Sequence, residues 1–188
     1  MRPHARVAVL FVLLAAIATG VPPAATGGPK GACRDATLVP TGANGARVAA
    51  ASLCLLNVER RSQGLAPLRG DRELQAAARR YSREMVMRHF FEHVDPNGDT
   101  LTSRVGRTAY LRRARSWCLG ENIAWNLPPQ ATAQATVRTW MGSPEHRIHV
   151  LDARYRDIGI GVSNGSPRGD GGPGATYTAV FGGRGRGR

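Results

Sequence analysis

Residues whose types can do chemistry lie in three short clusters in the second half of the chain. The clusters occupy residues 93–98, 120–125 and 140–147. Each cluster places a residue able to bind a metal or move a proton beside turn formers or aromatic residues, and such combinations are typical of functional clefts. The sequence therefore predicts a cleft lined by His93, Glu121 and His146.

Two neutral imidazoles and a carboxylate can hold Zn²⁺ and still leave a coordination position open, which is the arrangement of catalytic zinc. We therefore expect His93 and His146 to be metal ligands, with zinc or another divalent cation as the candidate cofactor. A hydrolase also needs a base beside the metal-bound water and a pocket that positions the substrate. The sequence identifies neither, so it leaves open whether the chain is an enzyme.

A second arrangement of metal ligands is an alternative. Residues 89–93 read His-Phe-Phe-Glu-His, which fits the H-x-x-E-H pattern of the inverted zinc peptidases. On a helix, His89 and His93 would share one face. However, Val94, Asp95 and Pro96 follow directly, and they indicate that a helix frays at this point.

The elements that must position these residues follow from apolar periodicity and from turn formers. A first helix is expected over residues 47–63 and a second helix after Asp71, a good N-cap, which the pair Phe90-Phe91 extends. A tight turn at 95–98 ends it. The remaining expected elements are a short helix at 100–107, an extended segment at 118–125, a helix from Pro128-Pro129 to Pro144, and strands at 158–162 and 175–181. Strands that come late and close together favour an antiparallel hairpin.

The N-terminus has the pattern of a secretory signal peptide. Arg2 and Arg6 precede an apolar run over residues 7–18, and small residues follow at Ala24 and Ala25. The predicted organisation is a signal peptide at 1–25, a flexible arm at 26–46, one domain at 47–182 and a Gly-Arg tail at 183–188. No later stretch approaches the ~20 apolar residues of a membrane helix. We expect a secreted protein, extracellular or at the cell envelope, without a transmembrane segment in the mature chain.

The chain has three cysteines. Cys33 and Cys54 flank the start of the first predicted helix, and an exported setting favours a disulfide between them. Cys118 is left over. It is either a buried thiol or the exchange partner in a different pairing.

The composition is strongly basic, with 26 Lys and Arg residues against 13 Asp and Glu residues and a formal net charge of +13. A basic surface attracts anionic envelope polymers and phospholipid headgroups over a long range. Nucleic acid is not an expected partner, because the chain is predicted to be exported and shows no recognised nucleic-acid-binding motif. A solvated basic face without any partner is the alternative.

Taken together, these residues resemble the CAP superfamily of cysteine-rich secretory, antigen 5 and pathogenesis-related 1 proteins, and most of all its bacterial secreted branch. The resemblance extends from Leu55 to about Phe181. It rests on six motifs in the family's order: residues 56–61 with Gly64-Leu65, Leu68 before the second helix, His93 with Asp95-Pro96, residues 120–123, Trp140 with Ser143-Pro144 and His146-Arg147, and residues 158–162.

The resemblance implies an α+β fold, a three-layer α-β-α sandwich with a central antiparallel sheet. It also implies a cavity lined by two histidines and two acidic residues. His93 matches the first histidine, Glu121 the acidic residue of the Gly-Glu-Asn signature, and His146 the second histidine. The position of the family's other glutamate is occupied by Ser143.

Eukaryotic relatives are associated with sterol and lipid binding, host interaction and immunity. The resemblance therefore implies a binding or interaction module, with a lipid, an anionic envelope polymer or a protein as its partner. The alternative function is a metal-dependent extracellular hydrolase that uses His93, Glu121 and His146.

Overall fold

A computed structural model describes residues 33–169 and 172–185 of the chain. The predicted signal peptide and the last three residues of the predicted tail lie outside the described residues. The helices are α1 (Gly45–Ser62), α2 (Arg72–Met87), α3 (Leu101–Gly106), α4 (Ala133–Gly142) and α5 (Pro144–Leu151). The strands are β1 (Arg69–Gly70), β2 (Ser116–Asn126), β3 (Asp157–Asn164) and β4 (Ala175–Gly185).

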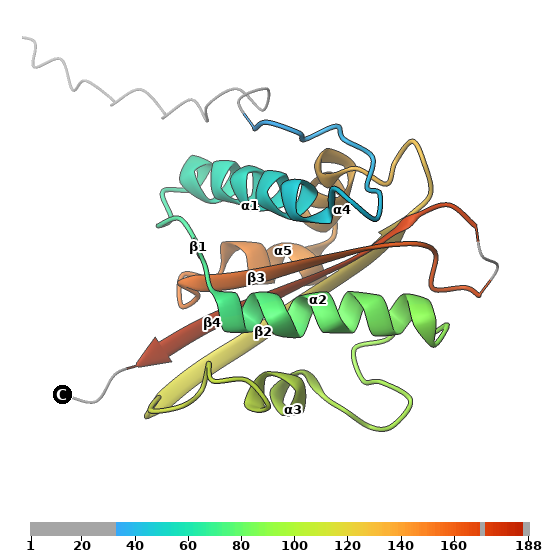
Figure 1. The fold of residues 1–188 in the computed structure, drawn as a ribbon. Coiled ribbons are helices and arrows are strands. Elements are labelled where there is room, and N and C mark those ends of the chain that lie inside the picture. Colours follow the sequence, from blue (N-terminus) through green and yellow to red (C-terminus); the bar gives the residue numbers. More distant parts are fainter. Residues whose placement is uncertain (1–32, 170–171, 186–188) are drawn as a thin grey trace, which may run out of the picture.

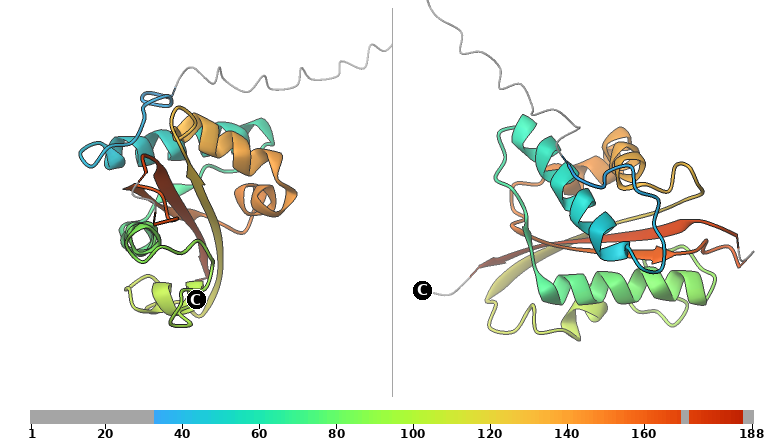
Figure 2. Two further views of the ribbon diagram at one scale, coloured as in Figure 1. Left: turned by 90° about the vertical axis from the view of Figure 1, so that its right-hand side faces the viewer. Right: turned by 45° about the horizontal axis from the view of Figure 1, so that its top comes forward.

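The four strands form one sheet in the order β1-β3-β4-β2. Helices α2 and α3 cover one face, and α1, α4 and α5 lie on the other (Figures 1 and 2). The α+β sandwich of three layers is therefore confirmed. The three long strands are antiparallel, as expected, whereas the two-residue strand β1 runs parallel to β3, so the sheet as a whole is mixed.

The end of the second helix differs from the prediction. Helix α2 begins after Asp71, whose side chain accepts hydrogen bonds from two backbone N–H groups of the first turn, but it ends at Met87. His89 then adopts φ 56°, a left-handed conformation that stops a helix. Phe90 and Phe91 therefore lie outside α2, and the prediction that His89 and His93 share a helical face is wrong.

The prolines of the second half also act differently from the prediction. Pro128 and Pro129 lie in a loop, and α4 begins only at Ala133, where the Thr132 side chain accepts a hydrogen bond from the Ala135 N–H. Pro144 does not simply end the helical region. It opens a further helix, α5, because the first turn of a helix tolerates a residue without an N–H donor.

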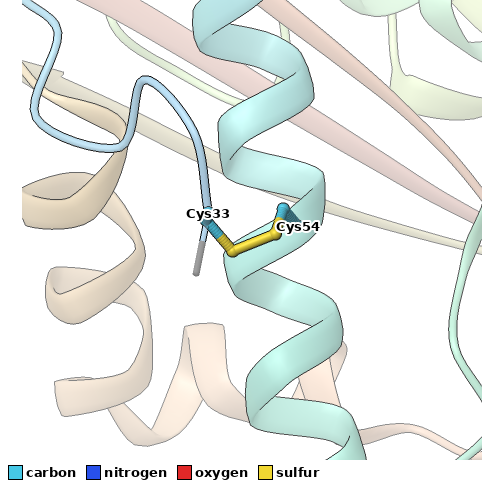
Figure 3. Close-up of a disulfide and its surroundings, with 2 residues drawn as sticks. All are labelled: Cys33 and Cys54. Carbon is cyan, nitrogen blue, oxygen red and sulfur yellow. A yellow bond between two sulfur atoms is a disulfide. The ribbon is translucent and has the colours of Figure 1, made fainter. Parts of the chain in front are cut away.

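The disulfide between Cys33 and Cys54 is confirmed (Figure 3). It ties the start of the described chain to α1 and closes a segment of 21 residues. Cys118 is a free thiol, as the first of the two alternatives has it, but it is half-buried against the larger core and not fully buried. None of the helices in the described ranges is both long and apolar enough to cross a bilayer.

Two glycines of β3 allow α2 to pack directly on the sheet. A Cβ atom at Gly159 would overlap the backbone of Leu74, and one at Gly161 would overlap the backbone of Ala78. The alternation of glycine with Ile158 and Ile160 therefore has a simple function. The isoleucines fill the core beneath α1, while the glycines leave room for α2 on the opposite face.

We predict that Gly161→Ala lowers the free energy of unfolding by about 1–3 kcal/mol, because the backbone of α2 must move to admit the methyl group. Chemical denaturation measures the change. Gly142→Ala is the matched control, since a Cβ there meets no atom within 4 Å, and we expect less than about 0.5 kcal/mol. Equal losses in the two variants would contradict this account of the packing.

Candidate functional site

The predicted site residues meet at β2, the edge strand of the sheet, but they approach it from two faces. Successive side chains of a strand point to opposite faces. Glu121 accordingly contacts Arg104 of α3, whereas Asn122 contacts the backbone of His146 in α5. The structure therefore brings His93 and Glu121 into direct contact, whereas the backbone of His146 lies on the other side of the strand, with its ring near enough to His93 to be affected by the charge of that residue.

Both carboxylate oxygens of Glu121 have partners. Glu121 Oε1 lies 2.9 Å from His93 Nδ1, and Glu121 Oε2 accepts a hydrogen bond of 2.7 Å from Arg104 Nη2. Glu121 is 6% exposed and Arg104 is 5% exposed, so this ion pair is buried. Hydrogen bonds between ionised groups are the strong ones, and burial reduces their screening by solvent.

Arg104 makes three further contacts, two with the loop before α3 and one with α2. Its Nη1 donates to the backbone oxygens of His93 (3.0 Å) and Asp99 (2.9 Å), and its Cζ lies 3.4 Å from the ring centroid of Tyr81 in α2. A guanidinium over an aromatic face is attracted by the ring. We call Tyr81, His93, Arg104 and Glu121 the arginine clamp, because the contacts of Arg104 join α2, α3, β2 and the loop before α3.

The predicted tight turn at 95–98 is confirmed and shapes that loop, with Gly98 N–H donating to Asp95 O at 2.8 Å. Asp95 Oδ1 accepts from the N–H groups of Asn97 and Asp99, and Oδ2 accepts from Arg88 at 2.8 Å. The hydrogen bond from the Asp99 backbone, followed by the Arg88 contact, lowers the pKa of Asp95 below its ordinary value. The turn fixes the chain two residues after His93.

The other side of β2 carries two polar atoms that no described residue satisfies. Asn122 is fully buried and its Nδ2 donates to His146 O at 2.9 Å, but Asn122 Oδ1 and His146 Nδ1 have no hydrogen-bond partner within the described chain. Burial lowers the pKa of His146, and the nearby charge of His93 acts in the same direction. The neutral form of His146 is therefore favoured.

His149 lies near His146, one turn further along α5. It is half-buried, and its ring stacks on Phe181 with centroids 6.3 Å apart. Burial, then the charge of His93, lowers the pKa of His149. Its position three residues after His146 was a usable signal, because residues three apart lie on one side of a helix.

Ser143 and Glu145 do not add a carboxylate to the clamp. Ser143 lies at the junction of α4 and α5, and its hydroxyl donates to Glu145 Oε2 at 2.9 Å. Glu145 itself is exposed. The second acidic residue that the resemblance implies therefore has no equivalent at this position.

The arrangement of donors does not fit a divalent cation at Glu121. The guanidinium of Arg104 already neutralises that carboxylate, and a cation bound there would meet its positive charge at close range. Within the described residues, no three His, Cys, Asp or Glu side chains are grouped to hold a metal ion. A metal held by His93 and His146 stays a prediction.

The fold and the site define an α-β-α sandwich domain with a histidine–glutamate pair at its edge strand. The sequence matches the cysteine-rich secretory protein family, CAP, over residues 53–181. The chain therefore belongs to this family, as the resemblance implied.

The chain is similar to proteins from several bacteria. The uncharacterized protein YkwD of Bacillus subtilis is 34% identical over 113 residues, which cover 60% of this chain and 41% of YkwD. An extracellular SCP-domain protein from Bacillus anthracis is 25% identical with a TM-score of 0.57, covering 73% of this chain and 39% of that one. An outer surface protein of Borrelia burgdorferi shares the fold at 18% identity and a TM-score of 0.58, covering 71% of this chain and 90% of that one.

We predict that Arg104→Gln lowers the free energy of unfolding by about 3–5 kcal/mol, because it leaves the Glu121 charge buried without its partner. The double variant Arg104→Gln with Glu121→Gln loses less than Arg104→Gln alone, since neither buried group is then charged. Denaturant titrations of the wild type, of the two single variants Arg104→Gln and Glu121→Gln, and of the double variant measure the coupling.

Arg107→Gln is the matched control for this cycle. Arg107 forms a 2.7 Å ion pair with Asp99 on the surface near the end of the same helix, and exposed pairs contribute about 1 kcal/mol or less. A double variant that loses the sum of the two single losses would show that the two side chains are not coupled.

Proposed function

We propose that the chain is an exported binding module that attaches to anionic components of the cell envelope, with the phospholipid surface as its ligand. The observation that carries this proposal is a set of exposed arginines beside an exposed tryptophan at one end of the sheet. We call this set the basic end, and it consists of Arg112, Arg113, Arg115 and Trp117.

The basic end is suited to a negatively charged interface. Its three arginines form no ion pair within the described part of the chain, so their charges are available to an external ligand. Trp117 follows at the start of β2 and is 47% exposed. Tryptophan is enriched where one side of a surface is apolar and the other wet, as at lipid headgroups.

Export is supported by separate features. The disulfide between Cys33 and Cys54 suits an oxidising compartment, and the related protein from B. anthracis is described as extracellular. The N-terminal pattern predicted from the sequence agrees with these two features. The chain spans 41% and 30% of two curated relatives, so what those whole proteins do enters only as part of the proposal.

The alternative, a metal-dependent hydrolase using His93, Glu121 and His146, requires more change. Glu121 would have to leave Arg104 before it could bind a metal or accept a proton from water. That step would leave a buried guanidinium without its carboxylate, at a cost of several kcal/mol. The geometry of the arginine clamp therefore favours binding over hydrolysis.

We predict that the mature protein sediments with vesicles containing phosphatidylglycerol and not with vesicles of phosphatidylcholine alone. Binding weakens as salt rises from about 0.05 M to about 0.5 M, because screening shortens the reach of the charges. Each arginine near an anionic surface contributes about 1 kcal/mol. Replacing Arg112, Arg113 and Arg115 with Gln should therefore weaken binding roughly 100-fold.

A variant with the same change in net charge is the control: Arg61, Arg80 and Arg138, exposed on three different helices, are replaced with Gln. It should bind nearly as well as the wild type. Trp117→Ser separates lipid from soluble polymer, since it should weaken binding to vesicles and leave binding to polyphosphate unchanged. Equal losses in both triple variants would contradict a role for the basic end.

A further inference from the structure

A cleft beside the open edge of β3 is lined by residues of α1 and α2, on a part of the molecule that the proposed function does not use. Figure 1 shows these two helices on either side of β3. It consists of two adjoining hollows of about 410 and 340 Å³, which share Ala46, Gln75, Arg79 and Ile160 among their lining residues. Gly70 of β1 lines one hollow, and Thr41, Gly42, Ala43 and Gly45 line the other.

The floor of this cleft is an incompletely paired strand. β1 pairs with β3 only at Asp157 and Ile158. Two residues on, the side chain of Gln75 takes the place of a neighbouring strand, since its carboxamide binds both the N–H and the C=O of Ile160. One amide side chain thus supplies the donor and acceptor that a peptide group would supply.

Val162 lies two residues further along the same edge of β3, and no side chain in the described ranges takes the place of a neighbouring strand there. In an antiparallel pair the backbone groups of alternate residues point to the same side, so the groups of Val162 point away from β4, as those of Ile160 do. The described residues offer Val162 no hydrogen bond on that side. Its carbonyl lies against Gly45, where a Cβ atom would approach to 3.3 Å.

The two walls of the cleft differ in chemistry. The α1 wall is apolar and consists of Ala46, Ala49, Ala50 and Leu53. The α2 wall carries Arg79 and Arg83, both exposed and without an ion pair among the described residues. An occupant should therefore be apolar on one side and negatively charged on the other.

The spacing of the two arginines matches an extended peptide. Residues four apart on a helix have Cβ atoms about 5–6 Å apart. Side chains two residues apart on a strand point to the same face and are separated by about 6.5 Å. An acidic residue, an apolar residue and a second acidic residue in sequence would place both carboxylates beside Arg79 and Arg83 and the apolar side chain against α1.

From this match we infer that the cleft binds an extended peptide segment with alternating acidic and apolar residues, added to the sheet as a strand beside β3. The peptide backbone replaces the Gln75 carboxamide at Ile160 and accepts a hydrogen bond from the Val162 N–H. Strand addition of this kind takes affinity from main-chain hydrogen bonds and specificity from the alternate side chains.

The test uses the mature protein and a fluorescent eight-residue peptide of alternating glutamate and valine, with anisotropy as the readout of binding. We expect Arg79→Glu or Arg83→Glu to weaken binding at least tenfold. Arg80→Glu is the matched control, because Arg80 is an exposed neighbour on the same helix that does not line the cleft. It should leave the affinity within about twofold of the wild type.

A second peptide separates strand addition from simple charge attraction. The same sequence with methyl groups on alternate backbone nitrogens keeps the carboxylates but loses every second N–H donor. Two such peptides exist, and the one methylated at the nitrogens that face β3 should bind at least tenfold more weakly. Hydrogen exchange should show slower exchange of the Val162 amide when the unmodified peptide binds. The inference is overturned if the peptide fails to bind at millimolar concentration, if neither methylated peptide binds more weakly than the unmodified one, or if Arg80→Glu weakens binding as much as Arg79→Glu.

Discussion

Arg104 and Glu121 form an ion pair that is almost completely buried, and such a pair is stable only where its other hydrogen-bonding groups are satisfied as well. The fold meets this requirement with contacts from several elements. Backbone oxygens of the loop before α3 accept from the guanidinium, the ring of Tyr81 covers it, and His93 binds the second oxygen of Glu121. The positions of α2, α3 and the edge strand β2 therefore depend on one another.

This dependence indicates that the histidine–glutamate pair has a structural role. A carboxylate shared by an arginine and a histidine is a structural anchor first, and its use as a base or metal ligand requires the anchor to break. The surfaces that remain available are elsewhere, at the arginines around Trp117 and at the incompletely paired edge of β3. Both are suited to binding, and neither uses the residues of the arginine clamp.

Much of the fold could be predicted because its signals are local. Asp71 caps α2, the apolar residues of α2 recur at helical spacing, and the glycines of β3 alternate with isoleucines. The end of α2 could not be predicted, because it depends on the left-handed conformation of His89. Helix α5 was missed because Pro144 was interpreted as a stop, although proline also suits a first turn.

Part of the candidate site could be predicted because two of its residues also stand in local sequence motifs. His93 and Glu121 stand in recognisable motifs, and the structure joins them at 2.9 Å. Arg104 is one of 26 basic residues in the sequence, and nothing in its neighbours indicates a partner 17 residues away. Its role appears only when α3 packs beside the edge strand, so the residue that decides the chemistry of Glu121 was the one the sequence could not identify.

The central claim is that Arg104 holds Glu121 in a structural role, and a crystal structure of the mature protein grown with excess Zn²⁺ tests it most directly. The account predicts that Glu121 keeps its contacts with Arg104 and His93 and that no zinc binds to its carboxylate. A zinc ion bound by His93, Glu121 and His146, with Arg104 displaced from the carboxylate, would contradict it.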